Sequence, residues 1–190
     1  MRIFQGFDAL PQFRHAAATV GSFDGVHLGH RALLRHLTGI ARTAGGESVV
    51  LTFEPHPRIA LGRAEGMRLL TPLDKKIELL SALDIDNLVI IPFDRAFSTL
   101  SGREFIERCI CGAVGAETLI VGYNHRFGHD RIGAAEIEAL ELLRVVRVDE
   151  CRVAGEHVSS TVIRRLLDEG RVEEAERLLG HCVSIKNQKL

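Results

Sequence analysis

Short apolar runs alternate along the chain with longer segments in which apolar residues recur every three or four positions. Runs rich in β-branched and other apolar residues predict buried strands. They cover residues 18–21, 48–53, 88–92, 118–122 and 145–149. Helical periods fill the intervals, so strands and helices are expected to follow one another in turn.

Helices are predicted where the apolar period is close to 3.6 residues. Thr71 is expected to cap one of them with Pro72 at the first helical position. Ser101 and Glu104 form the pattern of a capping box at the start of another. The last two helices are expected to meet at Gly170. The predicted helices cover residues 28–44, 71–83, 101–110, 134–143, 161–169 and 172–179.

Strict alternation of strands and helices requires crossover connections, which make neighbouring strands parallel. The sequence therefore predicts an α/β protein with a doubly wound, Rossmann-like parallel sheet covered by helices on both faces. Ligands of such folds bind at the carboxyl ends of the strands. Candidate chemistry is then expected in the segments that follow Gly21, Phe53, Pro92, Gly122 and Asp149.

Composition and charge narrow the possible partners. The chain has 190 residues, of which 46% are hydrophobic and 26% charged, as in a single soluble globular domain. Lys and Arg number 24 against 25 Asp and Glu, a net charge of −1, so neither nucleic acid nor an anionic membrane is an expected partner. No apolar stretch approaches the ~20 residues of a membrane span, and the start lacks a signal region. We expect a cytoplasmic protein.

The segment 21–30, GSFDGVHLGH, follows the first predicted strand and leads into a helix. Free amides and the helix dipole favour an anion there, and glycine lets a phosphate approach the main chain. Two imidazoles add hydrogen-bond donors. The alternatives are a metal site, with His56, His125 or His129 as further ligands, and an ordinary polar helix start. A P-loop is excluded because Gly-Lys-Ser/Thr does not occur.

A second candidate anion site is the segment 158–164, VSSTVIR. Hydroxyls and free amides at a helix start can bind anionic oxygens, and Arg164 lies one turn from Ser160 on the same face. The alternative is an ordinary helix N-cap, which Ser-Ser-Thr commonly forms. The two segments together favour a phosphate-binding function over this alternative.

These motifs resemble those of a known family. Gly-x-Phe-Asp-Gly-x-His-x-Gly-His is similar to the signature of the HxGH nucleotidyltransferase superfamily, in which a serine- and threonine-rich turn closes over the triphosphate. The segments 53–57, FEPHP, and 121–128, VGYNHRFG, resemble the adenylyltransferase module of bacterial FAD synthetases. Further matches at 70–76 and 93–105 extend the resemblance over residues 1–180.

The resemblance implies a fold of the nucleotidyltransferase type and transfer of AMP from ATP to FMN, giving FAD and pyrophosphate, with Mg²⁺ as cofactor. It implies catalytic roles for His27, His30 and Arg164, and a place near the metal for Asn124. The residues implied to contact ATP or FMN are Gly21, Phe23, Asp24, Gly29, Phe53, Pro55, His56, Pro57, Asn124, Arg126, Phe127, Ser159, Ser160 and Thr161.

Two of these roles stay open. Aromatic and proline surfaces suit a flat heterocycle, so the 53–57 turn and Phe127 can form a wall for the isoalloxazine ring. Phe53 can equally be a core residue of its strand. Arg126 can meet a phosphate or pair with Asp130 at the surface.

The chain also departs from the family pattern. His125 stands where many relatives have phenylalanine, and Asn124 stands where aspartate is frequent, which weakens a magnesium ligand. The stretch from Gly133 to Val158 is a few residues shorter than usual. These differences concern the metal geometry and the edge of the adenine site.

No Pro-Thr-Ala-Asn motif of a riboflavin kinase module occurs in the chain. We expect an adenylyltransferase domain at 1–180, a tail or truncated linker at 181–190, and no riboflavin kinase activity. The chain is either a natural single-activity protein or one cut at the domain boundary, and a separate riboflavin kinase would then supply FMN. The alternatives are a nucleotidyltransferase for phosphopantetheine or nicotinamide mononucleotide, and a flavin- or nucleotide-binding module without turnover.

Overall fold

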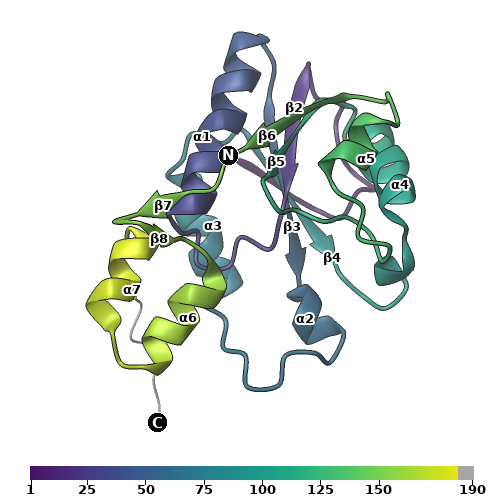
Figure 1. Cartoon of the computed structure of the whole chain (residues 1–190). Helices are drawn as coiled ribbons and strands as arrows, with labels where there is room; N and C mark the ends of the chain where they lie inside the picture. Colours follow the sequence, from purple (N-terminus) through teal and green to yellow (C-terminus); the bar gives the residue numbers. More distant parts are fainter. Residues whose placement is uncertain (184–190) are drawn as a thin grey trace.

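A six-stranded parallel sheet forms the centre of the molecule in the computed structural model, which describes residues 1–183 (Figure 1). The strand order is β1-β4-β3-β2-β5-β6, and every neighbouring pair runs parallel. All five predicted strands are present, with ends within two residues of their expected positions. The strands are β1 (Arg2–Gln5), β2 (Ala16–Val20), β3 (Ser48–Glu54), β4 (Asn87–Pro92), β5 (Ala116–Gly122) and β6 (Arg144–Val148).

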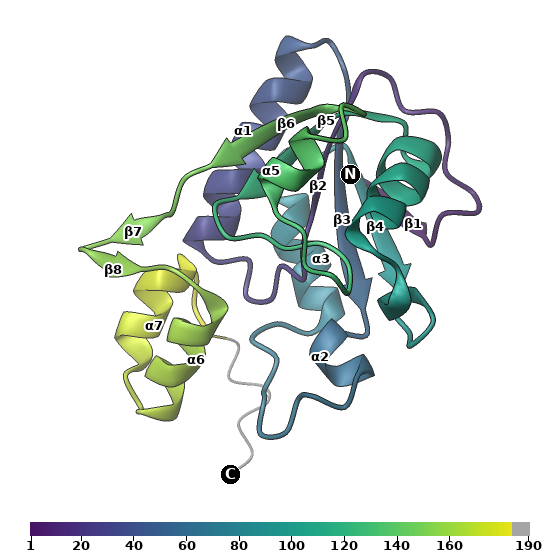
Figure 2. The same ribbon diagram turned by 45° about the vertical axis from the view of Figure 1, so that its right-hand side comes forward.

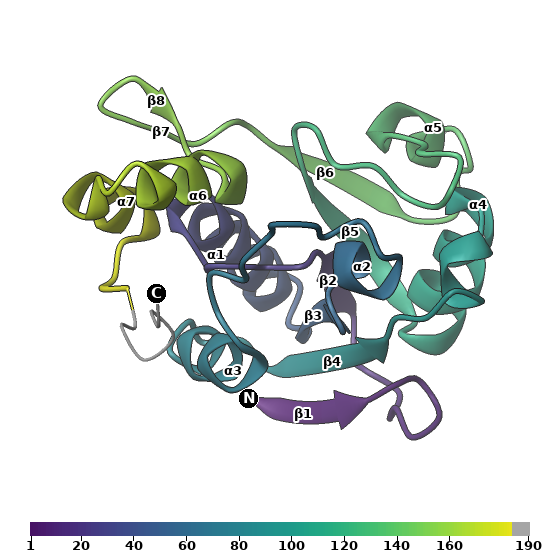
Figure 3. The same ribbon diagram turned by 90° about the horizontal axis from the view of Figure 1, so that it is seen from below.

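Helices cover both faces of this sheet, which confirms the doubly wound α/β class (Figure 3). Successive residues of β3 show why, because Val49 and Leu51 face one apolar cluster and Val50 faces the other. The first cluster includes residues of the π-helix η2 (Phe105–Ala113), and the second those of α1 (Leu28–Thr43) and α3 (Leu73–Ser81). The short helices α4 (Gly102–Glu104) and α5 (Ala134–Glu138) lie on the side of η2.

A helical pair and a β-hairpin form one corner beside the sheet (Figure 2). The hairpin consists of β7 (Arg152–Val153) and β8 (Glu156–His157), and the helices are α6 (Ser160–Asp168) and α7 (Val172–Leu179). They share a separate apolar cluster that also contacts residues at the start of α1 and before α3. This packing holds the start of α6 against the segment 21–30. The cluster includes Val158, Ile163, Leu166, Leu178 and Leu179, with Leu28 and Leu70 against it.

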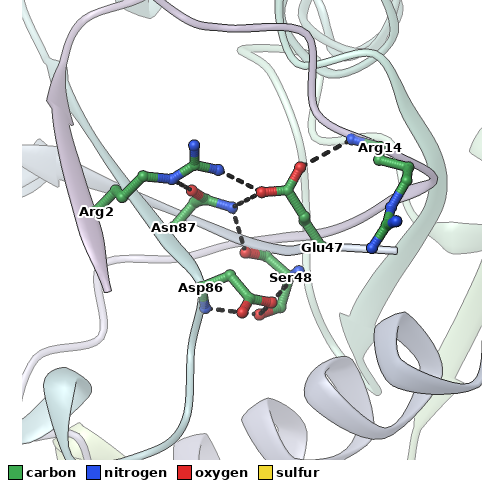
Figure 4. A network of polar contacts seen from close by, with 6 residues as sticks. All are labelled: Arg2, Arg14, Glu47, Ser48, Asp86 and Asn87. Carbon is green, nitrogen blue, oxygen red and sulfur yellow. Dashed lines mark hydrogen bonds and ion pairs between the residues drawn. The ribbon is translucent and has the colours of Figure 1, made fainter. Parts of the chain in front are cut away.

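Polar side chains form a closed network at the amino end of the sheet (Figure 4). Asn87, which is fully buried, accepts from Arg2 Nε at 2.9 Å and donates to Ser48 O at 3.3 Å and Glu47 Oε1 at 3.4 Å. Asp86 Oδ2 accepts from the backbone amide and the hydroxyl of Ser48 at 2.8 and 2.7 Å. These bonds tie the starts of β1, β3 and β4 together.

Several elements differ from the sequence predictions. The strand β1 and the hairpin were not predicted, because they are too short for a clear alternation. Neither were α2 (Pro57–Ala60) and the 3₁₀ turn η1 (Phe97–Thr99). The helix expected at 134–143 ends at Glu138, and Glu141 adopts a positive φ of 54°. The capping box of Ser101 and Glu104 is confirmed.

The prediction that Thr71 caps α3 is wrong. The helix begins at Leu73 with Pro72 as its N-cap and no side-chain capping bond. The hydroxyl of Thr71 instead accepts from the backbone amide of Gly25 at 3.0 Å. A long-range contact has thus replaced the local cap, and it fixes the segment before α3 to the loop after β2.

The beginning of the predicted tail is attached to the domain. The ring of His181 donates to the carbonyl of Gly25 at 2.8 Å, and the amide of Val183 donates to Glu176 Oε1 at 2.8 Å. The remainder of the predicted tail, 184–190, lies outside the described residues. Within residues 1–183, no helix is long and apolar enough to cross a membrane.

Candidate functional site

A cavity of about 340 Å³ opens between the carboxyl ends of β2 and β5, where the strand order reverses. The chain winds outward on one side through β3 and β4, then returns to place β5 on the other side of β2, which makes this the topological switch point. The expected location at the strand ends is confirmed. The predicted residues on the wall are Gly21, Phe23, His27, Gly29, His30, Asn124, Ser159, Ser160 and Thr161.

The two histidines of the segment 21–30 stack on each other at the start of α1. His27 is the N-cap, and its Nδ1 accepts from the backbone amide of His30 at 3.2 Å. The ring centroids lie 3.6 Å apart, with 14° between the planes. Gly29 permits this approach, because a Cβ there would meet the His27 ring at 3.2 Å and Val158 O at 3.4 Å. Since Nδ1 accepts, the ring proton of neutral His27 is on Nε2, which remains available as a donor.

Burial keeps both imidazoles neutral at physiological pH. It lowers the pKa of His27 to about 4, and the nearby His157 and Arg164 act in the same direction. Burial also lowers the pKa of His30 well below its usual range, with His27, Lys76 and His125 as further causes. The buried Nδ1 of His30 has no hydrogen-bond partner among residues 1–183. The pair therefore offers neutral donors whose polar atoms the protein leaves partly unsatisfied.

Asp24 links the segment 21–30 to α6 rather than lining the cavity. Its Oδ1 accepts from the backbone amides of Leu70 and Thr71 at 2.9 and 3.0 Å, and its Oδ2 accepts from the guanidinium of Arg164. Its carbonyl accepts from the hydroxyl of Ser160 at 2.8 Å. Neither Asp24 nor Arg164 lies on the wall of the first cavity. Their predicted contacts with a ligand stay predictions, while their bonds to each other hold the two motifs together.

The start of α6 serves as both a helix cap and a cavity wall. Ser159 is the N-cap, and its hydroxyl accepts from the amide of Val162 at 3.3 Å, while the residue also lines the cavity. Thr161 lines the cavity, and its exposed side chain has no described hydrogen bond to protein. The amides of this first helical turn are suited to an anion in the cavity.

A second cavity of about 620 Å³ lies beyond the carboxyl ends of β3, β4 and β5. Its apolar wall is aromatic, with Phe53 and Phe93 packed edge to face at 5.2 Å and Phe93 and Phe97 at 5.6 Å. Phe53 thus belongs both to the core of the sheet and to the cavity wall. The aromatic residues on the wall are Phe53, Phe93, Phe97, Phe105 and Phe127, and the arginines are Arg63, Arg95, Arg126 and Arg131.

The remaining predicted residues divide between this cavity and the surrounding structure. Pro57 and Arg126 line the second cavity, whereas Pro55 and His56 line neither cavity. His56 caps α2, with its Nδ1 accepting from the amide of Arg58 at 3.2 Å. The alternative pairing of Arg126 with Asp130 is not observed, and Asp130 Oδ1 accepts from the amide of Gly102 at 2.8 Å.

Some residues of the site were not predicted from the sequence. Lys76 lines neither cavity but lies near enough to His30 to influence its pKa; it is 4% exposed with its Nζ 3.4 Å from Thr52 Oγ1, and burial lowers its own pKa. The apolar stripe of its helix gave no signal for a buried amine. At the rim of the first cavity, Tyr123 shares a hydrogen bond of 3.2 Å with His157, whose other ring nitrogen lies 2.6 Å from Glu150 Oε1. Asp149 and Cys151 also line this cavity, at the expected end of β6.

Oxygen ligands rather than a histidine cluster are available for a metal. No group of three or more His, Cys, Asp or Glu side chains suited to a metal ion occurs within the described part of the chain. Asn124 and Asp149 both line the first cavity. Mg²⁺ prefers oxygen and is commonly held by one or two such side chains together with substrate phosphates. These residues fit such an ion, whereas the alternative of a metal bound by histidines has no support in residues 1–183.

The two cavities are adjacent. Among their lining residues, Val20 and His125 belong to both walls. The polar cavity at the switch point and the aromatic cavity therefore lie side by side, as sites for two ligands or for two parts of one ligand would.

The parallel sheet, its switch point and the histidine-bearing helix start define a Rossmann-like protein of the nucleotidyltransferase type. A crystal structure of a macrolide-efflux protein from Streptococcus pneumoniae is similar over 96% of this chain and 72% of its own, with a TM-score of 0.87 and 26% identity. Pantothenate synthetase from Thermus thermophilus, at 18% identity and a TM-score of 0.56, covers 95% of this chain and 81% of its own and shares the fold alone.

Sequence comparison identifies the family. The model of FAD synthetase matches residues 10–162, and the chain belongs to this family. It is 35% identical to a bifunctional riboflavin kinase/FMN adenylyltransferase of Listeria monocytogenes over 88% of this chain and 54% of the relative. It is also 35% identical to a putative bifunctional enzyme of Geobacillus thermodenitrificans, over 89% of this chain and 92% of the relative. The chain spans less than two thirds of the length of the Listeria protein and of a Buchnera aphidicola relative, of which it covers 62%.

Proposed function

We propose that the protein is an FMN adenylyltransferase, which transfers AMP from ATP to FMN and releases pyrophosphate. The observation that carries this proposal is the junction of a cavity lined by helix starts and histidines with a cavity lined by phenylalanines. The first suits the phosphates of ATP, and the second suits an isoalloxazine ring. We assign the activity to residues 1–180. A riboflavin kinase activity elsewhere would supply FMN.

The chemistry needs positioning more than it needs a base. The phosphate of FMN carries about 1.5 to 2 negative charges near neutral pH, so its oxygen can attack the α-phosphorus of ATP without losing a proton. A new P–O bond forms while the bond between the α-phosphorus and the bridging oxygen of pyrophosphate breaks. Catalysis then consists of holding the two phosphates in line and stabilising the charge that develops.

The residues on the cavity wall are suited to that task. The Nε2–H of His27 is free to donate to a phosphate oxygen, and the His30 ring lies directly against it. The first turn of α6, with Ser159, Ser160 and Thr161, would bind the departing pyrophosphate. Arg164 would contribute through its bond to Asp24, which holds α6 against the signature segment. Mg²⁺, held by the phosphates with Asn124, would neutralise part of their charge.

The other nucleotidyltransferase activities are less well supported. The second cavity is lined by five phenylalanines, which suit a flavin ring, and nothing in phosphopantetheine would use that aromatic surface. A binding module without turnover stays an alternative that only an assay separates from an enzyme.

One assay tests the proposal. The purified protein is incubated with ATP, Mg²⁺ and FMN, and the products are separated by chromatography; FAD and pyrophosphate are expected in equal amounts. Flavin binding without FAD formation would instead identify a binding module. Turnover of another phosphate ester, with no binding of FMN, would overturn the assignment to flavin. Riboflavin with ATP serves as the control substrate, and no FMN is expected from it.

A further inference from the structure

His125 occupies the junction of the two cavities. Their walls share two residues, and the other, Val20, is an apolar residue at the end of β2. Of the two residues that line both cavities, His125 is therefore the one with a polar side chain, and a ligand that spans both cavities would pass it.

The backbone and a neighbouring ring fix the position of His125. Its amide donates to the carbonyl of Gly122 at 3.1 Å, which closes a turn directly after β5. Its ring lies against Phe127, with the centroids 4.3 Å apart and an angle of 40° between the planes. Phe127 is 4% exposed and pairs with Ile132 through two backbone hydrogen bonds of 2.9 and 3.0 Å. The imidazole is thus held in place before any ligand arrives.

The ring nitrogens of His125 have no hydrogen-bond partner among the residues described. An imidazole carries at least one N–H donor whether it is neutral or protonated. This positioned donor has no protein partner and lines both cavities beside the signature histidines, so it is available to a ligand there.

The phosphate of FMN is the ligand group that belongs at this junction, and this step rests on the proposed function. The isoalloxazine ring would lie in the aromatic cavity and ATP in the other. The phosphate of FMN must reach the α-phosphorus of ATP, so it crosses from one cavity to the other. We propose that His125 donates a hydrogen bond to the phosphate of FMN, and so favours the binding of FMN over riboflavin.

A phenylalanine at this position could not make such a bond. Replacing the imidazole with phenylalanine should therefore remove phosphate recognition but retain the aromatic contact with Phe127.

Comparing FMN with riboflavin tests this role, because the two share the isoalloxazine ring and differ by the phosphate. Affinities are measured by flavin fluorescence at pH 7.5 for the full chain, without ATP. In His125→Phe, we expect FMN affinity to fall about 10- to 100-fold, the usual range for one bond to a charged group, with riboflavin affinity unchanged. His125→Asn keeps an N–H donor and should restore part of the difference. His36→Phe, on the exposed face of α1, is the matched control and should bind both flavins as the wild type does.

The outcomes separate this inference from the proposed function. Equal affinities of wild type and His125→Phe for FMN would overturn the role of His125, while FAD formation by both proteins would leave the function intact. An equal loss for FMN and riboflavin would also contradict it, since that pattern indicates damage to the aromatic wall. If His125→Phe weakens binding of a non-hydrolysable ATP analogue and not of FMN, the bond belongs to the nucleotide and the inference is wrong. A wild-type protein that binds no flavin would refute the proposed function itself.

Discussion

The two ends of the same parallel sheet both carry buried polar side chains, but the protein satisfies them differently. At the amino end, Asn87 bonds to three neighbouring residues, and the starts of three strands are joined (Figure 4). At the carboxyl end, the buried Nδ1 of His30 has no hydrogen-bond partner in residues 1–183. The first arrangement is complete without a ligand, and the second is not.

This difference distinguishes groups that maintain the fold from groups that act on a substrate. A buried polar group without a partner raises the free energy of the folded state by about 1 to 3 kcal/mol, so it persists where function uses it. In a closed network, hydrogen bonds within the protein replace the hydrogen bonds to water that burial removes. Removing a residue should therefore reduce stability at the amino end and turnover at the carboxyl end.

The largest expected effect is on turnover at the carboxyl end. His30→Ala should lower kcat about 100- to 1000-fold, the usual loss for one donor to a transition-state oxyanion, while the affinity for FMN changes little. Steady-state kinetics and FMN titration of the same preparation provide the two values. His36→Ala, an exposed histidine of the same helix, is the control and should retain kcat. Equal losses in kcat and in affinity would contradict a role in the transition state.

The histidines that stay neutral in the folded protein should also make its stability depend on pH. The pKa values of His27 and His125 are about 4 in the folded protein, against about 6.5 in an unfolded chain. Between these values the unfolded state binds more protons, so the free energy of unfolding decreases as pH falls from about 6.5 towards 4. Each histidine contributes up to about 3 kcal/mol of this decrease, and the full stability is present above pH 6.5.

Urea unfolding at pH 7 and at pH 4.5 measures this effect, with His125→Phe as the comparison. The variant lacks one titrating group, so its stability should fall less than that of the wild type over the same interval. An identical fall in the two proteins would show that His125 titrates normally in the folded state.

A smaller effect is expected at the amino end. Asn87→Ala removes three hydrogen bonds from a buried network and should lower the free energy of unfolding by about 2 kcal/mol, since Ser48 O and Arg2 lose partners. Turnover at a temperature where the variant is folded should stay at the wild-type value. A matching loss of kcat would mean that the network also positions the carboxyl end, and the contrast between the two ends would then disappear.

Much of the fold could be predicted because its signals are local. Each central strand is a run of apolar residues buried on both sides, and α1 carries its apolar stripe to the glycines that end it. The edge strand β1 escaped prediction because three of its four residues are exposed. The helix start at Thr71 was placed wrongly because the hydroxyl found a partner 46 residues away.

The candidate site likewise has features that local sequence signals predict and features that they do not. The segments 21–30 and 158–164 were expected to act together, and the structure brings both to one cavity. What the sequence could not indicate is that Asp24 and Arg164 bond each other across 140 residues, or that Lys76 turns its amine inward. Both features depend on partners far away in the sequence, so local sequence patterns carry no signal for them.

The sequence by itself determined the order of strands and helices, the two anion-binding helix starts and the aromatic residues beside them, because propensity, capping and periodicity act over a few neighbouring residues. Only the tertiary structure decided which polar groups bond to the protein and which face a cavity. The switch point places the ends of β2 and β5 side by side, and it leaves His125 between two cavities. Whether a polar group finds a hydrogen-bond partner depends on residues far apart in the chain, so the tertiary packing decides it.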